Sequence, residues 1–165
     1  MFITVHAAVA TIIGKKTNDA AIAFILGFIS HFIFDFIPHG DEHMGKKFFG
    51  NRLKALKEDG DLKVMAIYGT ADSVFLAMFL IYLYKSFSFA NSDTVMWAII
   101  GALLPDLNAA FSKLTNWKIF APLQAVHVAN HHFLVKRFRV DFPLRYGIFM
   151  QVCIMSALIW IIYAV

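Results

Sequence analysis

The sequence predicts an all-α protein, a polytopic membrane bundle of about four to six helices formed by a single domain over residues 1–165. Hydrophobic residues make up 59% of the chain and charged residues only 16%, whereas a soluble domain carries about 25% charged residues. The apolar residues gather into runs close to the ~20 residues that cross a bilayer. A chain of 165 residues also fits one domain, since domains usually span ~100–200 residues.

The first apolar stretch, residues 1–14, is short and is followed by Lys15 and Lys16. It predicts a helix that crosses the bilayer only in part or lies at its interface, because a full span needs ~20 residues. No basic residue precedes this stretch, so we expect no cleavable signal peptide.

The next apolar run, residues 19–38, predicts a complete span. Asn18 or Asp19 is placed to act as its N-cap, and Pro38 is placed to stop it. A polar stretch follows, in which residues 46–57 alternate phenylalanine and leucine with lysine and arginine. This alternation predicts a short amphipathic helix at the membrane surface.

Four further runs predict the remaining helices, at residues 64–89, 93–111, 119–138 and 144–165. The run at 119–138 is less hydrophobic than the others and ends in a basic cluster, whereas the run at 144–165 is the last and the cleanest span, with Arg145 as its one charged residue. We expect a multi-pass protein of the inner or plasma membrane. Lys and Arg divide almost evenly between its two predicted sides, so the positive-inside rule gives no orientation.

The ionisable residues of these helices fall toward one side of the membrane when the chain is followed through its alternating spans. Such residues are rare in membrane helices and usually face a bundle interior or a watery cavity, which makes each a candidate for function. Random placement would scatter them over both sides. The residues are His6, His31, Asp35, His39, Asp72, Asp106, His127 and His131.

Two pairs of these residues have the spacing of neighbours on one helical face. His31 and Asp35 are four residues apart, and so are His127 and His131. Helical bundles build metal sites from ligands one turn apart together with ligands from facing helices. Imidazole and carboxylate ligands without thiolate suit Zn, Mn or Fe. The spacing therefore predicts a metal site at one end of the bundle.

Other residues refine this site. Asp106 follows Pro105, which we expect to disturb its helix and turn the carboxylate toward a neighbour. Asp35 is the candidate for a ligand shared between ions, and Asp72 is the candidate for a catalytic base. The one cysteine, Cys153, lies in an apolar run and can form neither a thiolate cage nor a disulfide within a monomer.

Several histidines and acids have alternative interpretations. His6 could be an ordinary interfacial histidine. Asp72 could act as a cap or pair with a lysine such as Lys63, since charges within a membrane commonly pair with one another. Asp41 and His43 adjoin a polar loop, where a solvated role is expected. His132 is one helical step away from the face of His131 and fits a position behind the ligands or facing lipid.

Two motifs resemble those of known metal-dependent hydrolases. The segment His31-Phe-Ile-Phe-Asp35-Phe-Ile-Pro-His39-Gly resembles the His-x-x-x-Asp…Pro-x-His signature of zinc-dependent phospholipase C relatives and the matching stretch of the YdjM-like family of membrane-bound metal-dependent hydrolases. Gly101-Ala-Leu-Leu-Pro-Asp106 is similar to that family's Gly-x-Leu-Leu-Pro-Asp element. The resemblance implies metal ligation by the residues at the matching positions, with two later histidines added. They are His6, His31, Asp35, His39 and Asp106, followed by His127 and His131.

The resemblance implies hydrolysis of a phosphoester or ester by a water molecule that a divalent metal activates, with one to three zinc ions as the expected complement. The substrate could be a lipid, and the basic segment at 46–57 would then hold anionic headgroups. The excess of 15 Lys and Arg over 11 Asp and Glu indicates contact with membrane lipid rather than nucleic acid. The oligomeric state is left open.

Three other functions remain open on the sequence. A metal or proton transporter also uses histidines and aspartates within the membrane, but the last span offers none to continue a path. A haem protein could use His31 and His127 as axial ligands, although the neighbouring carboxylates suit harder metals. A non-catalytic metal-binding or scaffold role is the third.

Overall fold

The computed structural model describes residues 1–40, 59–86, 92–115, 118–131, 133–138 and 143–164. This part of the chain is helical and holds no strand, which confirms the all-α fold class. Six of its helices have 11 residues or more, in agreement with the expected number. The elements are α1 (Ile3–Lys16), α2 (Ala20–Asp35), α5 (Asp59–Ser86), α6 (Ser92–Thr115), the 3-10 turn η1 (Lys118–Phe120), α7 (Ala121–His131), α8 (Phe133–Phe138) and α9 (Leu144–Ala164).

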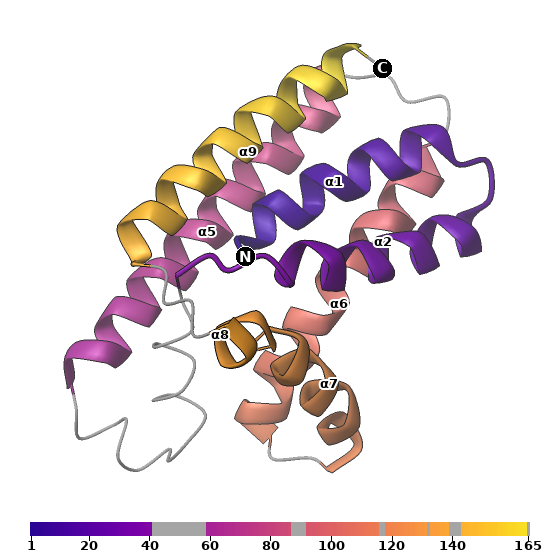
Figure 1. Ribbon diagram of the computed structural model, residues 1–165. Coiled ribbons are helices and arrows are strands. Elements are labelled where there is room, and N and C mark those ends of the chain that lie inside the picture. The colour runs from indigo at the N-terminus through magenta and orange to yellow at the C-terminus, as the bar shows by residue number, and fades with distance from the viewer. Residues whose placement is uncertain (41–58, 87–91, 116–117, 132, 139–142, 165) are drawn as a thin grey trace.

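The helices α1 and α2 form an antiparallel hairpin, and α6 packs against both of them (Figure 1). The long helices α5 and α9 contact α1 from its other side. The short helix α7 packs against α6 and α2, and α8 follows it. The chain therefore places the C-terminal end of α2 between the start of α1, the middle of α6 and the end of α7.

Small residues allow α2 and α6 to lie unusually close together. A Cβ atom on Gly27 would lie 2.1 Å from the carbonyl oxygen of Ala98, and one on Gly101 would lie 2.2 Å from the carbonyl oxygen of Phe24. Ala10, Ala23, Ala98 and Ala102 form a buried cluster at the same contact. Small residues at such contacts are typical of helices that pack within membranes.

The ends of α2 follow the expected signals. The side chain of Asp19 accepts a hydrogen bond from the backbone N–H of Ile22 at 2.8 Å, which confirms the N-cap. The helix ends at Asp35, before Pro38. In α6, by contrast, Pro105 lies inside a helix that continues to Thr115, so the proline does not end it.

Within the residues that the structure describes, three helices are long and apolar enough to cross a membrane, namely Ile67–Ser86, Ser92–Ser112 and Leu144–Ala164. They correspond to the predicted spans at 64–89, 93–111 and 144–165. The prediction of two further long helices was wrong. The helix α2 has only 16 residues, and the run at 119–138 is divided into η1, α7 and α8.

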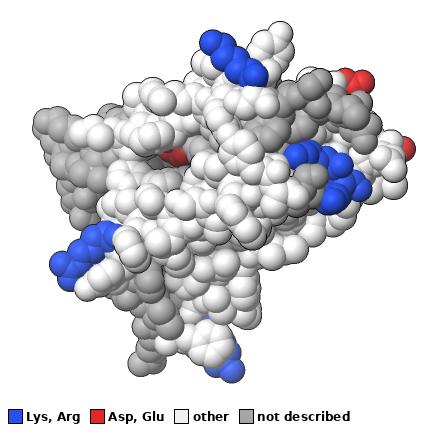
Figure 2. Space-filling view, turned by 90° about the horizontal axis from the view of Figure 1, so that it is seen from above, with Lys and Arg blue, Asp and Glu red and all other residues white. Residues whose placement is uncertain are grey.

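The surface matches this apolar composition. Large hydrophobic side chains are exposed along the spans, for example Phe75, Met78, Phe149 and Trp160. Viewed from above, the described part of the surface carries few charged side chains, and its basic side chains project mainly at the margins (Figure 2). A surface of this kind suits contact with lipid rather than water.

Candidate metal centre

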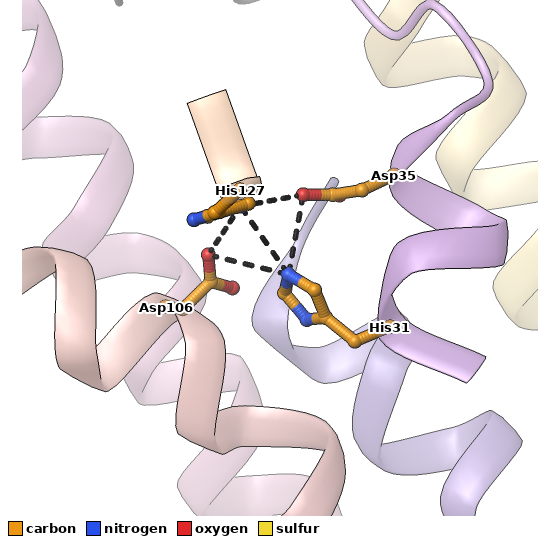
Figure 3. Close-up of side chains that lie close together, drawn as sticks. All are labelled: His31, Asp35, Asp106 and His127. Atoms are coloured by element: carbon orange, nitrogen blue, oxygen red, sulfur yellow. Dashed lines mark hydrogen bonds and ion pairs between the residues drawn. The ribbon is translucent and has the colours of Figure 1, made fainter. Parts of the chain in front are cut away.

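Four side chains from three helices point toward one another at the C-terminal end of α2 (Figure 3). His31 and Asp35 lie one turn apart on α2, as their spacing predicted, while Asp106 comes from α6 and His127 from α7. Each offers one ligand atom, and these four atoms all lie within 4.8 Å of one another.

The separations between these ligand atoms fit a single small cation. His31 Nε2 lies 3.3 Å from both Asp35 Oδ2 and His127 Nε2. His127 Nε2 lies 2.9 Å from Asp35 Oδ2. Asp106 Oδ1 lies 3.9 Å from His31 Nε2 and 3.6 Å from His127 Nε2. Ligands ~2.0–2.1 Å from a tetrahedral zinc ion lie roughly 3.4 Å apart, so these atoms are spaced like the corners of such a site.

A backbone contact orients the ring of His31. Its Nδ1 lies 2.9 Å from the carbonyl oxygen of Ala102 on α6, which can only accept, so Nδ1 carries the hydrogen and donates it. In the neutral ring Nε2 is then left with its lone pair directed at the other three ligand atoms. Histidine ligands of metals are typically held in this way through their second nitrogen.

The burial of these groups calls for a compensating positive charge. The side chains of His31 and Asp35 are 0% and 1% exposed, and that of His127 is 9% exposed. Asp106 is the most accessible of the four, at 27%. A carboxylate as buried as that of Asp35 is costly unless it is paired or coordinates a metal. A divalent cation would neutralise it together with the nearby carboxylate of Asp106.

A second group of ligand atoms shares Asp35 with the first. It consists of Asp35, His39 and His131, whose ligand atoms also lie within 4.8 Å of one another. The backbone carbonyl of Ile37 accepts from His39 Nδ1 at 2.7 Å, so in the neutral ring Nε2 of His39 carries the lone pair that a cation would bind. The amino group of Met1 lies 2.7 Å from Asp35 Oδ1 and contacts His39 Nε2. A positive charge is thus already present beside this group.

His6 lies next to both groups without belonging to either. Its Nε2 is 3.1 Å from Asp35 Oδ1, and its ring stacks on that of His31 with centroids 4.2 Å apart. Because a carboxylate accepts, His6 Nε2 is the donor in this hydrogen bond. Its expected role as a metal ligand stays a prediction, while its contact with Asp35 holds that carboxylate in place.

Asp72 lies outside both candidate groups. Its carboxylate accepts from the backbone N–H of Ile3 at 2.7 Å and from the hydroxyl of Thr4 at 2.7 Å. Its role as a base stays a prediction that these contacts do not test. Some sequence predictions lie outside the residues that the structure describes. They concern Asp41, His43, His132 and the amphipathic helix expected at residues 46–57.

Small residues on α2 and α6 bring the ligands together, and they were not among the residues predicted to form the site. Ala23, Gly27 and His31 follow one another at intervals of four on α2, and Ala98, Ala102 and Asp106 do so on α6. A small residue at every fourth position before a polar one indicates a close helix contact that leads to the polar residue. This signal was present in the sequence.

No family model matches this chain, and comparisons with curated proteins and with solved structures found no match either. The resemblance to the YdjM-like family and to phospholipase C relatives therefore stays a prediction that rests on the motifs. The geometry of the two His/Asp groups is independent of it.

Proposed function

We propose that this chain is a multi-pass membrane protein that binds a divalent metal through His31, Asp35, Asp106 and His127. We propose further that it uses the metal to hydrolyse a phosphoester or ester, in line with the resemblance to YdjM-like hydrolases. One observation carries the proposal: two carboxylates and two imidazoles from three helices direct their ligand atoms at one point in a buried position.

Zinc is the ion that this group of ligands favours. Two nitrogen and two oxygen ligands without sulfur suit Zn, Mn or Fe, and the separations of 2.9–3.9 Å between ligand atoms match a four-coordinate zinc site. A zinc ion held there would supply Lewis-acid chemistry, in which the pKa of a water molecule falls toward ~7. Because catalytic zinc keeps one position for water, three of these residues would hold the ion and Asp106, the most accessible of the four, would leave its position to water. The shared carboxylate of Asp35 allows a second ion, with His39 and His131 as its further ligands.

The exposure of the ligands indicates the side from which water and substrate would reach the metal. Asp106 is the ligand most accessible from outside, so water and substrate would approach along its side of the group. Leu104 and Leu107, its near neighbours on α6, are exposed. An apolar margin beside a polar centre suits a substrate that carries both an ester and a hydrocarbon chain. This supports a lipid ester or phosphoester as the substrate.

The site is unfavourable for haem, the alternative in which His31 and His127 would be the axial ligands. Axial ligands of a haem lie on opposite faces of the macrocycle, but here carboxylate oxygens of Asp35 and Asp106 lie within 3.9 Å of both Nε2 atoms, in the space that the macrocycle would need. The carboxylates of Asp35 and Asp106 occupy the other two corners of the same group. Two acids beside two imidazoles favour a small hard or borderline cation instead.

Metal analysis by mass spectrometry on the protein purified in detergent tests the metal part of the proposal. We expect at least one equivalent of zinc per chain, and we expect His31→Ala and His127→Ala to lose it. His43→Ala serves as the control, because this histidine belongs to a loop expected to be solvated. Equal metal content in all four proteins would contradict the site.

Hydrolysis is tested separately with the same proteins. Vesicles that contain a phospholipid with a fluorogenic ester or phosphoester bond provide the substrate, and release of the fluorophore provides the readout. We expect turnover in the zinc-loaded wild type and a loss of 10²-fold or more in His31→Ala, since the metal would supply several kcal/mol of transition-state stabilisation. Stoichiometric zinc without turnover of any such substrate would favour a transport or purely metal-binding role.

A further inference from the structure

The first helix has no N-terminal cap of its own. Phe2 occupies the N-cap position of α1 and forms no capping hydrogen bond through its side chain. Asp72, from α5, takes over this function: its carboxylate accepts from the backbone N–H groups of Ile3 at 2.7 Å and Thr4 at 3.3 Å. It also accepts from the Thr4 hydroxyl at 2.7 Å. An acid from a distant helix thus binds the first turn of α1.

The location of this acid is unusual for a residue without a role. Asp72 lies within Ile67–Ser86, one of the three candidate membrane spans. Ionisable residues in such segments are expensive and are retained for a specific partner. The free N–H groups and the positive end of the helix dipole at the start of α1 supply that partner.

The capped turn leads directly to the candidate metal centre. His6 follows Thr4 by two residues on α1 and donates to Asp35 Oδ1 at 3.1 Å. The same carboxylate turns its other oxygen to His127 at 2.9 Å. His6 and Asp35 are both 1% exposed, so neither side chain has room to readjust. A rotation or fraying of the first turn of α1 would therefore displace His6 and with it Asp35.

We propose that Asp72 is a positioning residue of the metal centre: it caps α1 from α5 and thereby fixes His6 against the metal-ligating carboxylate of Asp35. This inference rests on the proposed metal site and assigns to Asp72 an effect that is transmitted through His6. It differs from the base role predicted from the sequence, because it requires no contact of Asp72 with the substrate or the metal.

A double-mutant cycle between Asp72 and His6 tests the proposal. The zinc affinity of the detergent-purified protein is measured by competition with a chelating dye. We expect Asp72→Ala to weaken zinc binding ~10-fold or more, the usual effect of losing a residue behind the ligands. In the His6→Ala background we expect the same change to weaken binding by no more than about threefold, because only the contact of the Met1 amino group with Asp35 then links the first turn of α1 to this carboxylate. Ser73→Ala is the matched control, since the Ser73 hydroxyl bonds only to Gly69 of its own helix among the described residues.

The results of this cycle can support or overturn the positioning role of Asp72. Equal losses of affinity in the two backgrounds, or no loss from Asp72→Ala, would overturn the proposal. If Asp72→Ala does not fold, Thr4→Val removes one of the donors to Asp72 and Asp72→Asn keeps one acceptor oxygen. The cycle is then run with these variants, and the same non-additivity is expected.

A second readout separates this inference from the proposed function. The same cycle is performed on the thermal midpoint of the metal-free protein, where we expect the two substitutions to be non-additive as well. A wild type that binds no zinc would refute the metal site, and the thermal cycle would still decide whether Asp72 acts through His6. Additive thermal effects would overturn the positioning role.

Discussion

Asp35 Oδ2 and His127 Nε2 lie 2.9 Å apart, although 92 residues separate them in the sequence. The other oxygen of the same carboxylate faces His6 and the amino group of Met1. Asp35 is therefore the residue at which the two candidate ligand groups meet. Its position at the last turn of α2 is fixed by the close packing of α2 on α6.

The charge of Asp35 is required by both groups. Asp35→Asn preserves the shape of the side chain but removes the negative charge, and an amide is a much weaker ligand for zinc. We expect the zinc content of the purified protein to fall by tenfold or more. Asp93→Asn is a suitable control because Asp93 is an exposed acid in the first turn of α6. Unchanged zinc content in Asp35→Asn would refute its role as a shared ligand.

Zinc binding should weaken as the pH falls. Imidazoles must be neutral and carboxylates ionised to coordinate a metal, so binding competes with protons. The apparent affinity should therefore decline as the pH is lowered, because protons then compete with zinc for the imidazole nitrogens and the carboxylate oxygens. A titration with a pH-insensitive zinc probe between pH 5 and 8 provides the measurement. An affinity that is the same at pH 5.5 and 7.5 would exclude histidine ligands.

The sequence was sufficient to predict the helical class and the polar residues that converge. The two ligands of α2 could be paired because they are one turn apart, and the alternating spans placed Asp106 and His127 on the same side. The spans at 19–38 and 119–138 were overestimated because apolar composition does not record where a helix ends. Hydropathy alone places Phe36 in the same run as α2, although the helix ends at Asp35.

The separation of the histidines into different roles could not be predicted from the sequence. His6 and His127 both lie on mostly apolar helices. Only the packing of α1 against α2 shows that His6 faces Oδ1 of Asp35 while His127 faces Oδ2. For Asp72 the sequence showed an acid within a span, but its partner is a backbone turn 68 residues away. Residue type gives no information about such a partner.

The close contact of α2 with α6 should not tolerate a larger residue in place of either glycine. A Cβ atom on Gly101 would lie 2.2 Å from the backbone oxygen of Phe24, so Gly101→Ala must push the two helices apart. Overpacking of this kind costs roughly 1–3 kcal/mol, and we expect a lower thermal midpoint together with weaker zinc binding. Gly69→Ala on α5 is the matched control, since nothing among the described residues lies within 4 Å of its Cβ position. It should be neutral or slightly stabilising.

The second ligand group can be tested without altering a ligand. Gly147 on α9 lies against the backbone of His39, and a Cβ atom there would be 1.8 Å from the His39 carbonyl oxygen. Gly147→Ala should therefore displace His39 from Asp35 and His131. It should leave His31, Asp106 and His127 in place, because α9 supplies none of the first group. If the protein binds two ions, we expect this variant to retain one and lose the other, measured by zinc titration in a calorimeter. Loss of both ions with an unchanged fold would mean that the two groups are not separate sites.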